Sequence, residues 1–211
     1  MSSPLQLQAV VETPYYQGEF LCPWDVPQFE PFSWIRLSGE MTYREIGLVF
    51  AQVVQFNDLD LSGERQAVLK RVVEAESLVL PGGIQVILGD KFIPPSCCCG
   101  LETWREWQDF LKTGESPWLG HDPSPWVERR SDIVRIWSNG GMGESVENAF
   151  HIDIPYPDFR EGLKTVERDL QAFLFCIDSW AREISFEQPN ALVQKFDRCF
   201  NIGTRYTELS V

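Results

Sequence analysis

The sequence predicts an α+β fold, in which a mixed or mainly antiparallel sheet carries three to four helices on one face. Short apolar runs rich in β-branched residues recur through the first three quarters of the chain, which is typical of strands. Apolar residues at spacings of three and four then predict one long amphipathic helix near the C-terminus. The 211 residues contain no internal repeat, so we expect a single domain over residues 1–211.

The N-terminal half is expected to supply strands and one helix. Residues 5–11 alternate between polar and apolar as a strand does, and residues 46–54 form an apolar run that suits a buried strand. Ser62 is typical of a helix N-cap, and the apolar spacing after it predicts a helix over 63–76. A Pro-Gly-Gly break precedes another expected strand at 84–88.

The C-terminal half is expected to alternate between helices and a hairpin. Trp and Leu spacing predicts a short helix over about 101–112. The strands 133–137 and 150–154 flank a Gly-rich turn, which predicts a β-hairpin. The long amphipathic helix is expected over 158–185, and a shorter helix should follow the break at Pro189.

The formal net charge of −13 is shared between both ends of the chain, while the middle is nearly neutral. A field of this sign repels phosphate backbones, so we expect no nucleic-acid binding, and it attracts basic partners. No run reaches the roughly 20 apolar residues that span a bilayer, and the first residues do not resemble a secretory signal. We therefore expect a soluble, cytoplasmic protein without a membrane partner, whose six cysteines are reduced.

Three contiguous cysteines, Cys97, Cys98 and Cys99, precede the 101–112 helix. A helix N-terminus can stabilise a thiolate, which would suit a nucleophile, a redox sensor or a soft-metal ligand. Contiguous cysteines do not match the ligand pairs of structural zinc, so Cys97 and Cys99 could share a metal only with ligands from elsewhere, such as His121, His151 or Cys22. The alternative is packing, because a thiol also serves as a small apolar side chain.

His121 and Asp122 lie in a loop rich in Pro and Gly, where functional residues are often found. Asp122 could orient the ring of His121 as a base, with Cys98 or Ser124 as the nucleophile. His151 alternates with apolar residues in a predicted strand, so we expect it to face solvent. No cofactor motif is present, and no cofactor is expected.

Four of the eight tryptophans are candidates for a binding surface. Trp104 and Trp107 share one face of the 101–112 helix, and Trp118 and Trp126 lie in the loop that follows. Tryptophan is enriched at interaction hot spots. Core packing is the commoner use of such residues, and it remains the alternative.

Two stretches resemble a known group of proteins. One is similar to a pattern in uncharacterised bacterial proteins and comprises Cys97-Cys98-Cys99-Gly100-Leu101-Glu102 with Trp104-Arg105-Glu106-Trp107. The other is similar to the tail of bacterial immunity-type proteins and ends in Asp169-Leu170-Gln171-Ala172-Phe173-Leu174. Together, residues 97–107 and 150–181 cover about a fifth of the chain. The resemblance implies a non-enzymatic binder that neutralises a toxin, and it carries no catalytic residues.

These observations lead to two functional hypotheses. The first is a non-enzymatic protein of immunity or inhibitor type that binds another, basic protein. The alternative is a thiol- or metal-dependent enzyme or redox sensor that uses the cluster Cys97–Cys99 with His121. The sequence does not indicate an oligomeric state.

Overall fold

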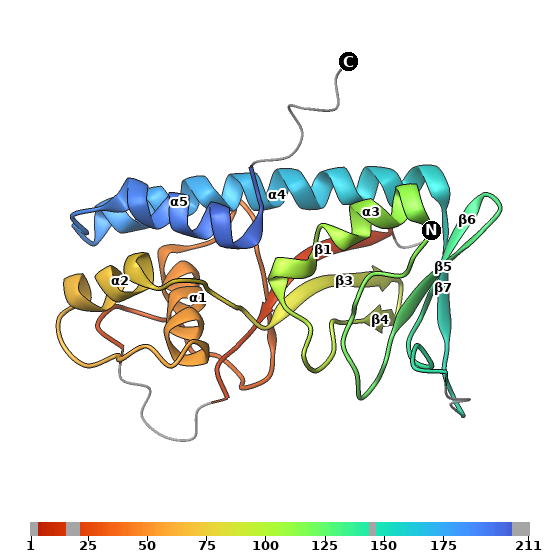
Figure 1. The fold of residues 1–211 in the computed structure, drawn as a ribbon, viewed down its shortest axis with the longest axis horizontal. Coiled ribbons are helices and arrows are strands. Elements are labelled where there is room, and N and C mark those ends of the chain that lie inside the picture. Colours follow the sequence, from red (N-terminus) through yellow and green to blue (C-terminus); the bar gives the residue numbers. More distant parts are fainter. Residues whose placement is uncertain (1–3, 16–21, 144–146, 204–211) are drawn as a thin grey trace, which may run out of the picture. The chain divides into compact units, whose positions relative to one another are not determined.

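The computed structural model describes residues 4–15, 22–143 and 147–203, and it confirms the α+β class (Figure 1). The strands and helices are, in chain order, β1 (Gln6–Glu12), β2 (Trp34–Arg36), α1 (Tyr43–Phe56), α2 (Arg65–Glu74), β3 (Gly82–Leu88), β4 (Lys91–Ile93), the 3-10 helix η1 (Leu101–Thr103), α3 (Glu106–Thr113), β5 (Trp126–Arg130), β6 (Ile133–Trp137), β7 (His151–Pro155), α4 (Tyr156–Glu183) and α5 (Pro189–Phe200). The expected long helix near the C-terminus is α4. None of the described helices is both long enough and apolar enough to cross a membrane.

The chain forms two compact units. Unit 1 comprises Met1–Val10 and Pro81–Arg168, and unit 2 comprises Val11–Leu80 and Asp169–Val211. The strand β1 and the helix α4 each begin in unit 1 and end in unit 2. The expectation of a single domain over residues 1–211 stays a prediction.

The described strands form two sheets, whereas the sequence analysis expected one. The first has the order β2-β1-β3-β4, and the second has the order β5-β6-β7. Strands β3 and β4 pair antiparallel, with Val86 opposite Ile93. The predicted hairpin is confirmed by β6 and β7, which pair antiparallel with Val134 opposite Ile154. The strands β2, β4 and β5 were not predicted. Strands β2 and β4 have only three residues each, and β5 begins at Trp126, inside a segment rich in Pro and Gly.

The expected strand at 46–54 is wrong, because these residues lie in the helix α1. Thr42 and Glu45 form a capping box: the Thr42 hydroxyl accepts from the Glu45 backbone, and the Glu45 carboxylate accepts from the Thr42 backbone. Every residue from Ile46 to Val54 is buried. A helix buried on all sides shows no amphipathic period, so its apolar run resembled a strand.

The predicted helix over 63–76 is confirmed as α2, although its start differs. The N-cap position is occupied by Glu64, and no side chain caps this end. Ser62 instead donates its hydroxyl to the Asp60 carboxylate at 2.6 Å. The predicted helix over 101–112 is split into η1 and α3, and the second helix after the C-terminal break is confirmed as α5.

The core of unit 1 contains the face that the sequence analysis offered for binding. Trp104 is fully buried and Trp107 nearly so. The ring of Trp107 lies 6.1 Å from that of Phe159 on α4. Arg105 donates to Glu167 at 2.8 Å, which anchors the start of α3 to the same helix. The start of α3, which follows the cysteine loop in the chain, is therefore anchored to α4 by core packing and one ion pair.

The core of unit 2 is aromatic. Phe50 of α1 stacks on Trp180 of α4 with ring centroids 4.8 Å apart, and Trp24 meets Trp180 edge-on at 5.5 Å. Phe196 of α5 lies 5.8 Å from Phe50. Rings in these offset and edge-on arrangements provide much buried area together with a defined geometry.

Candidate functional site

Two loops of unit 1 meet at a short antiparallel bridge between Cys97 and His121. The backbone N–H of His121 donates to the Cys97 carbonyl at 3.0 Å, and the N–H of Ser96 donates to the Leu119 carbonyl at 2.8 Å. The Ser96 hydroxyl adds a third bond, to the His121 carbonyl at 2.8 Å. The first loop follows β4 and the second lies between α3 and β5, so tertiary structure brings together residues that are 24 positions apart.

Gly120 permits this close approach of the two loops. Its φ of +96° lies in the left-handed region, and a Cβ built there would sit 2.5 Å from the Cys97 carbonyl oxygen. The neighbouring Trp118 binds the cysteine loop as well, because its indole N–H donates to the Cys98 carbonyl at 3.0 Å. The sequence analysis missed Ser96 and Gly120, although a glycine directly before a loop histidine is a usable signal of a tight turn.

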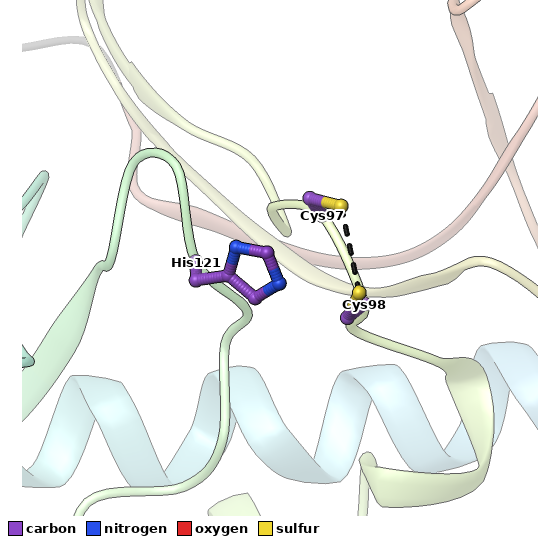
Figure 2. A group of neighbouring side chains, drawn as sticks. All are labelled: Cys97, Cys98 and His121. Atoms are coloured by element: carbon purple, nitrogen blue, oxygen red, sulfur yellow. Dashed lines mark hydrogen bonds between the residues drawn. The ribbon is translucent and has the colours of Figure 1, made fainter.

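The side chains of Cys97, Cys98 and His121 converge at this bridge. Their ligand atoms all lie within 4.8 Å of one another, and the two sulfur atoms are 3.5 Å apart. The Nδ1 atom of His121 is 2.9 Å from the Asp122 carboxylate. In Figure 2 the other ring nitrogen points toward Cys98. Asp122 therefore orients the imidazole so that Nε2 faces the thiols.

Electrostatics at this cluster favour a thiolate beside an imidazolium. The hydrogen bond from Cys97 lowers the pKa of the Cys98 thiol, and the hydrogen bond from His121 lowers it further. The hydrogen bond to Asp122 raises the pKa of His121, with a second contribution from Cys98. From the sequence, a lowered cysteine pKa was expected to come from the helix N-terminus. In the structure, the pKa of Cys98 is lowered by neighbouring side chains.

The third cysteine belongs to the core. Cys99 is buried, and burial raises the pKa of its thiol to about 12. Its sulfur lies 3.5 Å from the Trp118 carbonyl oxygen, and it packs against Gly83 of β3. The left-handed φ of Cys98, +63°, reverses the chain between an exposed thiol and a buried one. The candidate ligand set of Cys97, Cys99 and His121 thus becomes Cys97, Cys98 and His121.

The other candidate nucleophile, Ser124, and the other histidine, His151, lie outside this cluster. Ser124 is buried, and its hydroxyl donates to the side-chain oxygen of Asn139 at 3.1 Å. His151 packs its ring 4.8 Å from Trp137 and lies 3.7 Å from the Asp153 carboxylate. Neither side chain is among the three that converge at the bridge.

The four candidate tryptophans have different environments. Trp104 and Trp107 are core residues, so the folded surface does not present their rings to a partner. Trp118 is 43% exposed and lies 6.4 Å from the His121 ring, so it forms one side of the cysteine site. Trp126 is partly exposed and stacks on Trp137 at 5.9 Å. Trp118 is therefore the tryptophan that the structure connects with the cluster.

The donor set of this cluster permits two kinds of chemistry. An exposed thiol with an oriented imidazole can attack electrophilic sulfur, oxygen or carbon. Two thiolates and an imidazole also match the preferences of Zn²⁺ and Cu⁺, and a carboxylate bound to the second ring nitrogen is the usual support of a ligating histidine. The geometry of Cys97, Cys98, His121 and Asp122 is compatible with both.

Comparison of the chain with protein-family models, with curated proteins and with solved structures finds no match.

Proposed function

We propose that this protein is a thiol-based redox sensor whose reactive group is Cys98. The proposal depends on one observation, the convergence of two adjacent thiols and an Asp-oriented imidazole on the surface of unit 1. Both sulfurs are exposed, so a small oxidant can reach them without a binding cleft. The proposal develops the thiol hypothesis, and the binding hypothesis is kept as a second candidate function.

Each member of the cluster has a chemical role in this proposal. The Nε2 atom of His121 accepts the proton of the Cys98 thiol, and the carboxylate of Asp122 stabilises the resulting imidazolium. Cys97 donates its S–H to the thiolate of Cys98, which keeps that group charged. The lowered pKa of Cys98 and the raised pKa of His121 both favour this ion pair.

The test is the pH dependence of alkylation, measured for each cysteine by mass spectrometry between about pH 5 and pH 9. We expect Cys98 to react at lower pH than Cys99 and Cys22, since burial raises the pKa of each of those thiols to about 12. The variant His121→Ala should slow Cys98 several-fold near neutral pH. The matched control is His151→Ala, which removes the other histidine of the chain and should leave the rate unchanged.

Two results would contradict the proposal. One is a Cys98 alkylation profile that is the same in the wild-type chain and in His121→Ala. The other is a purified protein that contains stoichiometric zinc and alkylates at Cys98 only after chelation, because the site would then be a metal site. We expect chelator treatment to leave the alkylation rate unchanged.

As a second candidate function, we propose that the protein binds a basic partner protein and that unit 2 provides the binding surface. The resemblance to immunity-type proteins implies a non-enzymatic binder, and the acidic charge implies that the partner is basic. The supporting observations are chemical. Unit 2 contains 17 acidic and 9 basic residues, a net charge of −8. On α4, Phe175 is 75% exposed and borders a hollow of about 490 Å³ that Leu174 and Val193 also line. Exposed apolar groups within an acidic surface suit a basic partner with an apolar anchor.

This second candidate is tested by affinity capture with basic candidate proteins at low and high salt. We expect Phe175→Ser to weaken capture and added salt to reduce it. The control is Met142→Ser, which removes an exposed apolar side chain of unit 1. Binding that is insensitive both to Phe175→Ser and to salt would contradict it.

A further inference from the structure

We propose that Cys97 is the resolving thiol of this site, so that peroxide converts Cys97 and Cys98 into a disulfide between adjacent residues. The inference rests on the proposed function, because it requires Cys98 to be the thiol that is oxidised first. It adds the class of oxidant, the identity of the second thiol and the end state of the site.

The geometry selects Cys97 as the partner. Its sulfur is 3.5 Å from that of Cys98, and both side chains are exposed. The third cysteine of unit 1, Cys99, is buried, and its sulfur is directed to the Trp118 carbonyl oxygen. Figure 2 shows the sulfur atoms of Cys97 and Cys98 joined by the dashed line of this contact. A sulfenic acid on Cys98 would therefore meet the thiol of Cys97 first.

The reaction balances in two steps. The thiolate of Cys98 attacks one oxygen of hydrogen peroxide and breaks the O–O bond, which yields a Cys98 sulfenic acid and hydroxide. The thiol of Cys97 gives its proton to this hydroxide, which forms the first water molecule, and the Cys97 thiolate attacks the sulfenyl sulfur. The S–O bond breaks, and the oxygen leaves as the second water molecule after protonation by the His121 imidazolium. In total, two thiols and one peroxide give one disulfide and two water molecules.

The product should be easy to reduce, which suits a reversible sensor. Adjacent Cα atoms are only about 3.8 Å apart, whereas disulfide-bonded cysteines usually have Cα atoms roughly 4.4–6.8 Å apart. A bond formed under such strain is more reducible than a structural disulfide. A weak thiol reductant of the glutathione class should therefore restore both thiols.

The experiment treats the reduced full-length chain with one equivalent of hydrogen peroxide, blocks the remaining thiols and maps the peptides by mass spectrometry. We expect a loss of about 2 Da in the peptide that contains Cys97 and Cys98, reversed by glutathione. In Cys97→Ser the mass loss should disappear, and a 1,3-dione probe should label a sulfenic acid on Cys98. The matched control Cys99→Ser should behave as the wild-type chain does.

The outcomes separate this inference from the proposed function. If Cys98 alkylates rapidly but peroxide leaves Cys97 alkylatable and converts Cys98 to a sulfinic acid, the inference is overturned and the proposed function stands. A disulfide from Cys98 to Cys99, or between two chains, also overturns the inference. If Cys98 shows neither rapid alkylation nor oxidation, both proposals fail together with the assignment of Cys98.

Discussion

Units 1 and 2 each contain three cysteines, all within the described residues, but they place these thiols in different environments. In unit 2, burial raises the pKa of Cys22 to about 12, and desolvation also raises that of Cys176 on α4. In unit 1, Cys97 and Cys98 are exposed, and polar neighbours lower the pKa of Cys98. Burial thus suppresses the thiol chemistry of Cys22 in unit 2, whereas the joined loops of unit 1 expose Cys98 beside groups that lower its pKa.

The difference between these thiols shows that the reactivity of a cysteine depends on its surroundings and not on the residue type alone. Cys98 and Cys99 are adjacent, yet one has a lowered pKa and the other a pKa raised to about 12. Hydrogen bonds from Cys97 and His121 lower the pKa of Cys98, whereas burial raises that of Cys99, and the residue at which the exposed chain gives way to the buried one, Cys98, has a left-handed φ of +63°. Loops on a rigid scaffold can therefore expose a group that the neighbouring structure would bury.

The largest expected effect comes from disrupting the aromatic core of unit 2. Trp180→Ala removes a ring that is 1% exposed and contacts Phe50 and Trp24, so it should lower the free energy of unfolding by about 3–5 kcal/mol. Alkylation of Cys22 should then begin at lower urea concentration than in the wild-type chain, whereas Cys98 should react in both proteins without urea. Phe175→Ala on the same helix is the control, because that ring is exposed. An equal loss of stability in both variants would contradict this account of the core.

The next effect concerns the contact between the two loops of unit 1. Gly120→Ala places a Cβ against the Cys97 carbonyl and forces a residue with φ of +96° into strain, which should cost roughly 1–3 kcal/mol. Gly114→Ala is the matched control: its φ is +73°, but no atom lies within 4 Å of the added Cβ, so its cost should be about 1 kcal/mol. Only Gly120→Ala should also slow Cys98 alkylation. Equal alkylation rates in the two variants would show that the loop contact does not activate the thiol.

The smallest expected effect is confined to titration. Because the hydrogen bond to Asp122 is the main cause of the raised pKa of His121, Asp122→Asn should lower that pKa. The wild-type ring should stay protonated to higher pH than the ring in the variant, which an NMR titration would measure. An unchanged His121 titration would show that the carboxylate does not stabilise the imidazolium.

Several elements of the fold could be predicted because their residues repeat with a clear period. The helices α2, α4 and α5 and the hairpin of β6 and β7 have one buried face and one exposed face, and this alternation is visible in the sequence. The helix α1 could not be predicted in the same way. Its residues from Ile46 to Val54 are all buried, so this part of the sequence resembled a strand until tertiary packing was known.

The sequence by itself determined the local chemistry of the candidate site. Cys97 and Cys98 are neighbours, and so are His121 and Asp122, so each pair can interact through its own backbone. The tertiary structure decided that the two pairs meet, that Cys98 is exposed and that Cys99 is buried. The physical reason is that these outcomes depend on backbone hydrogen bonds between loops distant in sequence and on one turn geometry, and neither leaves a periodic pattern in the amino-acid order.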